Sequence, residues 1–492
     1  MATFTGKRKR EAAPAKPHPA KKAARNGTKN STQQDGDAAL KHTTSTAIGA
    51  LSGPIHIQII TGSYERVLHG LSASIPPQRL LDQAPSNTQN GTSGNENVTF
   101  SDIFLFAAHT AAIRCLAISP PQEADKRFLA TGSSDERINV YSLSTAPSLP
   151  TTAPKRPNLP SLSGSTIAEN PRNKSLGSLT HHDRAIAKLS FPTKSKLFSA
   201  AEDATIAIAR TRDWTILSSI KAPIPKPQGR PSGDTAGPGE IPAGVNDFAI
   251  HPSQKLMLSV GRGERCMRLW NLMTGKKAAV LNFERDLLAA VGEGKLGRGE
   301  GRRVLFDGKG DNYVVGFERG AALYHLDAKA KGVFKPAPAS KIHQMRFVPL
   351  GEEKSVLAMS TEDGRIIFFH AEADEEGLTQ YPIIAQLGGR AAGIEGRVKD
   401  FEILEVSGVL AFVTASSDGA VRIWSVSQTE LSSASEGQQC GRLVATHETG
   451  NRITCLGAFV LDGKVSDAPE PEREGEAGAE EAESEEDPDS DE

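Results

Sequence analysis

Residues 410–426 read LAFVTASSDGAVRIWSV, two apolar, β-branched runs on either side of the turn SSDG. Such runs around a short turn of Gly, Ser and Asp are typical of an antiparallel β-hairpin. A second stretch of this kind, FLATGSSDERINVYSL, occupies residues 128–143. In both stretches an aromatic residue follows the turn aspartate by six positions, so the hairpin is a repeated unit.

Seven acidic turn residues occur along the chain, and each is followed six positions later by a residue in the second run of its hairpin. The acidic residues are Glu65, Asp135, Asp203, Glu264, Glu318, Asp363 and Asp418, and the residues six positions later are Leu71, Tyr141, Ala209, Trp270, Tyr324, Phe369 and Trp424. Six hairpins follow a further apolar run, and a seventh such run, RITCLGAFVL at 452–461, comes after the last hairpin. We therefore predict an all-β fold, a seven-bladed β-propeller in which the C-terminal strand completes the first blade and removes the open sheet edge.

The distribution of apolar residues predicts the domain boundaries. Residues 1–50 and 464–492 are rich in charged and small residues and cannot bury enough apolar surface to offset the entropy of ordering, so we expect disordered tails around a propeller at 51–463. Disordered insertions are expected near 76–97, 144–175, 222–243 and 284–302. No apolar run approaches the 18 residues of a membrane span, which excludes a membrane-spanning class.

The two tails carry opposite charge. Residues 1–25 hold eight Lys or Arg and one Glu (+7), and residues 467–492 hold one Arg and fourteen Asp or Glu (−13). The basic tail has the two-cluster spacing of a bipartite nuclear import signal, with a nonspecific basic tail as the alternative; the residues concerned are Lys7, Arg8, Lys9, Arg10, Lys21, Lys22 and Arg25. In the acidic tail, Ser484 precedes three acidic residues and is a candidate phosphorylation site.

The repeat resembles that of the WD-repeat family, whose blades carry a His before the first strand, a Ser or Thr and an Asp at the turn, and a Trp six residues later. The resemblance implies buried hydrogen-bonded sets in which the turn Asp fixes the His, and the His bonds the Ser or Thr and the aromatic residue. The residues that match this pattern are His109, Ser133, Asp135, Tyr141, His182, Asp203, Thr361, Asp363, Phe369, Ser416, Asp418, Trp424 and His447. Ala209 and the glutamates at three of the seven turns depart from it.

Two patterns suggest chemistry that we do not expect in this protein. His109, Ser133 and Asp135 together suggest a nucleophilic triad, but parts of this set recur around the ring, which favours a structural role. The G-x-G-x-x-G pattern at 292–297 lacks the following helix that a phosphate-binding loop needs. We therefore expect no catalytic residue and no cofactor. The cysteines and histidines show no metal-ligand spacing, so we expect no metal site either.

Basic residues lie near the predicted turns and at the starts of the first strands. They could pair locally with the turn carboxylates, or they could form a rim that recognises RNA phosphates or an acidic protein segment. The rim residues are Arg66, Arg137, Arg184, Arg265, Arg303, Arg319, Lys341, Arg365, Arg397 and Arg452.

Longer motifs resemble a particular WD-repeat family. TGSYERVLHGL at 61–71, HPSQKLMLSVG at 251–261, RLWNLMTGK at 268–276 and RITCLG at 452–457 are similar to the maintenance-of-killer and p21-activated-kinase-interacting protein family. This resemblance implies a nuclear and nucleolar factor in assembly of the large ribosomal subunit. It also implies partners among large-subunit precursor proteins, including a ribosomal-protein-like assembly factor. Pre-ribosomal RNA is a further candidate partner because of the basic rim and the basic tail.

We therefore predict a non-enzymatic scaffold, a monomer within a larger particle, that acts in ribosome biogenesis and rRNA processing. The alternative is a negative regulator that binds a p21-activated protein kinase directly. We expect no membrane association.

Overall fold

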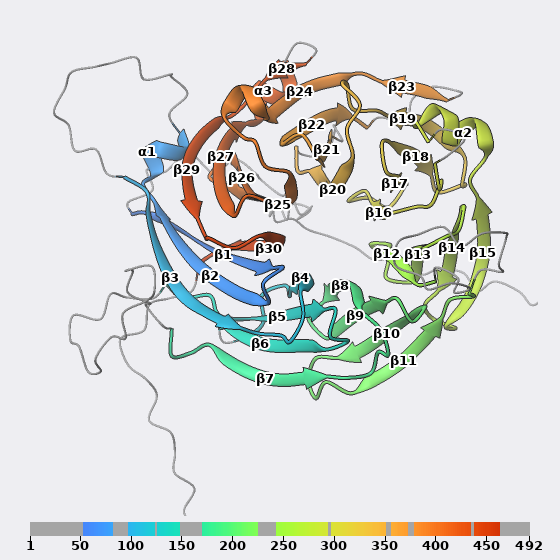
Figure 1. The fold of residues 1–492 in the computed structure, drawn as a ribbon, viewed down its shortest axis with the longest axis horizontal. Helices are drawn as coiled ribbons and strands as arrows, with labels where there is room; N and C mark the ends of the chain where they lie inside the picture. The colour runs from blue at the N-terminus through green and yellow to red at the C-terminus, as the bar shows by residue number, and fades with distance from the viewer. Residues whose placement is uncertain are drawn as a thin grey trace, which may run out of the picture. The chain divides into compact units, whose positions relative to one another are not determined.

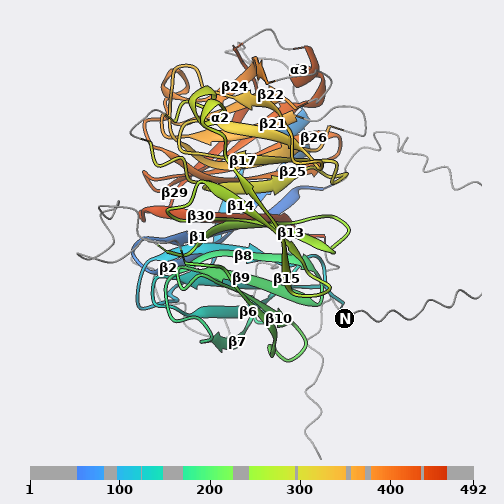
Figure 2. The same ribbon diagram turned by 90° about the vertical axis from the view of Figure 1, so that its right-hand side faces the viewer.

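The computed structural model describes residues 53–81, 97–123, 125–147, 170–224, 243–293, 297–350, 356–371, 378–433 and 437–462. Within these residues seven sheets follow one another around a ring, which confirms the predicted seven-bladed propeller (Figure 1). Figure 2 shows the same ring edge-on. No helix in these ranges is both long enough and apolar enough to cross a bilayer.

Each blade has four main strands, of which the innermost is named first. Blade 1 contains β30 (Ile453–Val460), β1 (Ile55–Ser63), β2 (Val67–Ile75) and β3 (Thr99–Ala107). Blade 2 contains β4 (Ile113–Ile118), β5 (Lys126–Ser133), β6 (Ile138–Ser144) and β7 (Lys174–Leu179). Blade 3 contains β8 (Ile186–Thr193), β9 (Lys196–Ala201), β10 (Thr205–Arg210) and β11 (Ile216–Lys221). Blade 4 contains β12 (Val245–Ile250), β13 (Leu256–Gly261), β14 (Cys266–Asn271) and β15 (Lys276–Asn282).

Two of the remaining blades carry a fifth, outermost strand that pairs in parallel. Blade 5 contains β16 (Arg303–Phe306), β17 (Asn312–Gly316), β18 (Ala321–His325), β19 (Ala330–Phe334) and β23 (Thr379–Tyr381). Blade 6 contains β20 (Ile342–Val348), β21 (Val356–Thr361), β22 (Arg365–His370), β24 (Ile383–Gly388) and β28 (Gln438–Gln439). Blade 7 contains β25 (Val398–Val406), β26 (Val409–Ser416), β27 (Ala420–Ser427) and β29 (Arg442–Glu448).

The ring closes through blade 1, as the sequence predicts. The C-terminal strand β30 pairs with β1 in antiparallel register, with Ile57 opposite Val460 and Ile59 opposite Ala458. The backbone N–H of Tyr64 also donates to the carbonyl of Arg452 at 2.9 Å. Both ends of the described chain are therefore held in one sheet.

The core is divided among the interfaces between neighbouring blades. Seven clusters of buried apolar side chains occur, and each one joins two adjacent sheets. Trp424, for example, is 3% exposed between blades 6 and 7. Alternating inward residues on each strand supply these clusters because successive side chains in a strand point to opposite faces.

Every second-to-third strand turn lies on the same face of the ring as the segment that enters an innermost strand. Backbone hydrogen bonds join the two, as from Ser134 N–H to Ala112 O at 3.0 Å and from Ser417 N–H to Arg397 O at 2.9 Å. We call this side the turn face. The first-to-second and third-to-fourth strand turns lie on the opposite face because the strands alternate in direction.

Two of the expected insertions contain short helices. Helix α1 (Pro77–Leu81) begins within the stretch predicted to be disordered at 76–97, and its Leu80 is 3% exposed. Helix α2 (Arg285–Ala290) falls within 284–302 and buries Leu287 and Leu288 against blades 4 and 5. The prediction of disorder was wrong at these positions, since each helix fills part of a core.

The structure describes only short parts of the other predicted insertions, and two further short helices. The stretch predicted at 144–175 is described only at its two ends, where β6 ends and β7 begins. Helix α3 (Gln428–Ser433) follows β27, and the 3-10 helix η1 (Arg390–Ala392) follows β24. The larger part of residues 222–243 and both predicted tails lie outside the described residues.

Candidate functional site

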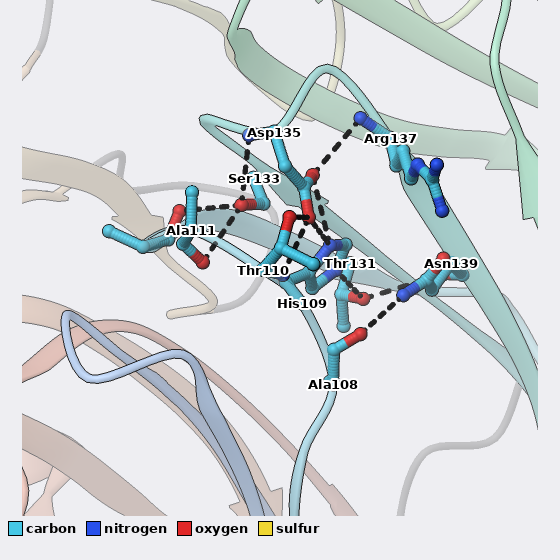
Figure 3. A network of polar contacts seen from close by, with 10 residues as sticks. Ala108, His109, Thr110, Ala111, Thr131, Ser133, Asp135, Arg137 and Asn139 are labelled. Carbon is cyan, nitrogen blue, oxygen red and sulfur yellow. Dashed lines mark hydrogen bonds and ion pairs between the residues drawn. The ribbon is translucent and has the colours of Figure 1, made fainter.

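The turn of blade 2 is held by a buried His and Asp pair. The Nδ1 atom of His109 lies 3.1 Å from Asp135 Oδ2, and its Nε2 atom lies 2.9 Å from Thr131 Oγ1 (Figure 3). The same carboxylate accepts hydrogen bonds from the backbone N–H groups of Thr110 and Arg137. This network ties the segment before the first strand to the turn, as the WD-repeat resemblance implies.

Ser133 does not take the predicted place beside the histidine. Its hydroxyl donates to the carbonyls of Ala111 and Ala112 at 3.0 and 2.9 Å, and Thr131, two residues earlier in β5, bonds His109 instead (Figure 3). The prediction for Ser133 was wrong because the imidazole reaches deeper into the sheet than the turn. His109, Ser133 and Asp135 thus do not form a nucleophilic relay.

Blade 3 repeats this arrangement. His182 Nδ1 lies 2.9 Å from Asp203 Oδ2, and His182 Nε2 lies 2.8 Å from Ser199 Oγ. Burial alone would raise the pKa of Asp203, but hydrogen bonds from His182 and Thr205 outweigh it and lower the pKa from 3.8 to about 2. Ala209, where an aromatic residue is usual, is buried in the interface with blade 2.

The lowered pKa of Asp203 makes a prediction about acid stability. Because the folded pKa lies below the unfolded value, this carboxylate stabilises the fold above about pH 4, and that contribution is lost as the pH falls towards about 2. We expect Asp203→Asn to cost about 1 kcal/mol at pH 7, allowing for solvent screening of a half-buried group, and almost nothing at pH 2. Urea unfolding across this pH range measures the difference. Asp183→Asn, at an exposed neighbour, is the control, and a cost for Asp203→Asn that does not change with pH contradicts the prediction.

In blades 4 and 7 an arginine takes the place of the histidine. Arg268 forms a two-pronged ion pair with Glu264, and Arg422 lies 3.2 Å from Asp418 Oδ2 and also bonds Ser416 Oγ at 3.2 Å. Each arginine stands two residues before the blade's tryptophan, Trp270 or Trp424.

The two tryptophans bond hydroxyls on the neighbouring second strands. The indole N–H of Trp270 donates to Ser259 Oγ at 2.8 Å, and that of Trp424 donates to Thr414 Oγ1 at 3.2 Å. Ser416 therefore bonds the arginine, and Thr414 is the partner of the tryptophan. The set predicted in blade 7 is thus hydrogen-bonded with an arginine in the place of the histidine, and blade 4 has a similar arrangement around Glu264.

Blade 6 has a smaller set. The hydroxyl of Thr361 donates to Asp363 and to the carbonyl of Arg365, and the Arg365 guanidinium pairs with Asp363 at 2.6 Å. Phe369 is fully buried between blades 5 and 6. Among the described residues this turn therefore uses an arginine of its own hairpin in place of a histidine.

His447 was assigned wrongly from the sequence. It lies within β29, the outermost strand of blade 7, and its ring contacts Phe100 at 4.9 Å and His69 at 6.2 Å between centroids. Both of those residues belong to blade 1. Proximity in sequence to the next innermost strand suggested a turn-holding histidine, but the side chain faces the neighbouring blade.

The ten predicted rim residues fall into three groups, according to the contacts that their side chains make. Three bond carboxylates: Lys341 with Glu318 at 2.9 Å, Arg365 with Asp363, and Arg397 with Glu362 at 3.1 Å. Three others bond or stack locally: Arg265 on the carbonyls of Gly297 and Arg298, Arg303 on that of His343, and Arg452 over the ring of Tyr64. The remaining four are exposed, and their side chains make no hydrogen bond or ion pair with any residue that the structure describes: Arg66, Arg137, Arg184 and Arg319.

Four of the predicted rim residues lie close enough to Lys399 or His343 to shift the pKa of these two side chains, which no sequence pattern indicated. Burial, and then Lys399, Arg303, Arg397 and Arg302, lower the pKa of His343 to about 3. Burial and Arg397 lower the pKa of Lys399, and Arg452 and Lys341 act in the same direction against Glu362. We call these residues, which lie on or directly before the innermost strands, the channel-mouth cluster; it comprises Arg302, Arg303, Lys341, His343, Arg397, Lys399 and Arg452.

The channel-mouth cluster has an excess of positive charge. Its six Lys and Arg residues outnumber the three carboxylates that lie against them, Glu318, Glu362 and Glu65, so the cluster keeps a net positive charge. Below it, a cavity of about 490 Å³ lies between the innermost strands of blades 3 to 7. Charged pairs line this cavity, including Lys188 with Asp247 at 3.4 Å and Arg346 with Glu402 at 2.6 Å. The excess positive charge of the channel-mouth cluster attracts anionic groups to the turn face.

The seven predicted import residues and Ser484 lie outside the described residues. They stay predictions from the sequence.

The geometry defines a seven-bladed β-propeller, and a family model described as "WD domain, G-beta repeat" matches residues 100–142. Within that class the chain is related to Protein MAK11 of Saccharomyces cerevisiae, with 28% identity over 83% of this chain and 84% of the relative. It is also similar to p21-activated protein kinase-interacting protein 1-like of Xenopus laevis (24%, 83% of each chain) and to Shk1 kinase-binding protein 15 of Schizosaccharomyces pombe (22%, 82% of this chain and 85% of the relative). These relatives confirm the resemblance found in the sequence.

Proposed function

We propose that this protein is a non-enzymatic scaffold for assembly of the large ribosomal subunit in the nucleolus, and that the channel-mouth cluster binds its anionic partners. The observation that carries the proposal is the excess of positive charge at one face of a rigid ring. Phosphate groups of pre-ribosomal RNA or an acidic segment of an assembly factor would be held there by several contacts of modest strength. The family resemblance supplies the ribosomal context.

Entry to the nucleus is part of the same proposal. The two basic clusters at 7–10 and 21–25 would bind the import carrier, and the same charges would favour RNA once inside. The acidic tail at 464–492 would compete for basic partners, more so if Ser484 is phosphorylated.

Charge reversal at the channel mouth tests the proposal. In cells depleted of the natural protein, the double variant Arg397→Glu/Arg452→Glu is expected to lower association with large-subunit precursors about tenfold and to reduce free large subunits on a sucrose gradient. The matched control is Lys196→Glu/Arg212→Glu, which reverses two exposed charges on the opposite face.

The outcomes of this experiment separate the alternatives. Normal large-subunit levels with the channel-mouth variant, when its melting temperature matches that of the wild type, contradict the proposed site. Normal levels after depletion itself contradict the ribosomal function. Nuclease treatment of the purified particles distinguishes an RNA partner from a protein partner.

We propose kinase binding as a second function because two of the relatives are named for it. In this function the propeller would bind a p21-activated kinase directly and restrain its activity. A two-component assay with the purified kinase measures inhibition. Inhibition without any loss of large subunits on depletion would favour this function over the ribosomal one.

A further inference from the structure

Three side chains that could hold a metal ion meet where the ring closes. They are His69 on β2, Asp102 on β3 and His447 on β29, and each offers one donor atom, all within 4.8 Å of one another. The first two belong to blade 1 and the third to blade 7. The positions are 33, 345 and 378 residues apart (102−69, 447−102, 447−69), so no sequence spacing could reveal them.

The surroundings of the cluster favour a bound cation. His69 and Asp102 are 5% and 7% exposed, and His69 Nε2 lies 2.8 Å from Asp102 Oδ1. The other ring nitrogen of His69, Nδ1, is buried and has no hydrogen-bond partner among the described residues. Two of the three candidate ligands are therefore buried and held side by side before any ion binds.

His447 completes the set from the opposite side. The ring of Phe100, 4.9 Å away, holds the imidazole against blade 1. His447 is half-buried, which leaves one side of the cluster open for the ion to enter and for a water molecule as fourth ligand.

We propose that His69, Asp102 and His447 bind one Zn²⁺ ion, which clamps blade 7 to blade 1 beside the β30–β1 closure. Two imidazoles and one carboxylate are a donor set that zinc accepts. A tetrahedral ion with bonds of about 2.0 to 2.1 Å places its ligand atoms roughly 3.3 Å apart, so the site closes by small side-chain movements from the present spacing. The clamp would stabilise the closed ring and shares no residue with the channel-mouth cluster.

The proposal is tested on the full-length chain after removal of metals with a chelator. We expect the wild type to bind one more equivalent of Zn²⁺ than His447→Gln, with a rise in melting temperature on adding Zn²⁺ that the variant lacks. Bound Co²⁺ should show a tetrahedral visible spectrum in the wild type only. His325→Gln removes a comparable half-buried histidine, on β18, and should bind as the wild type does.

Equal stoichiometry and equal melting shifts for the wild type and His447→Gln overturn the clamp, because the tails and other histidines would then account for the binding. If His447→Gln does not fold, X-ray absorption of the wild type with one equivalent of zinc decides. A first shell with two imidazoles supports the site, and a shell without them overturns it.

Discussion

Removal of residues 452–492 is expected to abolish cooperative folding, whereas removal of residues 464–492 is expected to leave the melting temperature unchanged. The longer deletion takes away β30, whose Ile453, Leu456 and Phe459 are at most 3% exposed. Burying these three side chains is worth about 5 to 9 kcal/mol, which approaches the whole stability of a typical domain. The loss also leaves β1 with an unpaired inner edge.

Circular dichroism melting and gel filtration of the two truncated chains measure this effect. The shorter deletion is the control because it removes the acidic tail and keeps every residue of β30. A cooperative transition at the wild-type temperature in the chain that ends at residue 451 would show that the ring can close without the terminal strand.

The second large effect is expected at the ion pair that replaces a histidine in blade 4. Glu264→Gln leaves the Arg268 guanidinium buried without its carboxylate, since the side chains of Arg268 and Glu264 are only 7% and 11% exposed. Breaking one side of a buried pair costs about 3 to 5 kcal/mol. Chemical denaturation of the purified variant measures the free energy of unfolding.

Two further variants separate charge from packing. Asp213→Asn breaks an exposed pair with Arg210 and is expected to change the stability very little. The double variant Glu264→Gln/Arg268→Met removes the stranded charge and should regain much of the loss. A cost for Glu264→Gln no larger than that for Asp213→Asn would mean that the pair does not hold the turn.

The fold could be predicted because one spacing recurs at seven turns and because the last apolar run lacks a hairpin of its own. Those features survive the insertions, and the pairing of β30 with β1 confirms the closure that they imply. Helices α1 and α2 could not be predicted in the same way. Each has only five or six residues and lies beside a stretch rich in Gly, Pro or charge, so no helical period could develop.

The sites were only partly predictable, because side-chain direction does not follow from spacing. Thr131 and Ser133 stand two positions apart in the same strand, and only the depth of the His109 ring decides which one bonds it. Lys399 and His343 lie inside apolar runs of two different blades, and they meet only once the innermost strands surround the channel. Local pattern thus identifies the elements, whereas long-range arrangement selects the partners.

The closure of blade 1 has a consequence for synthesis of the chain. The hairpin β1–β2 is complete at Ile75, but its inner partner ends at Val460, 385 residues later (460−75). At about 5 to 20 residues per second the ribosome needs about 20 to 80 s to supply that strand. Throughout this interval the nascent β1–β2 hairpin carries an unpaired inner edge, which is a site where strands of other chains could pair. The risk of association between chains is therefore expected to last until translation reaches β30.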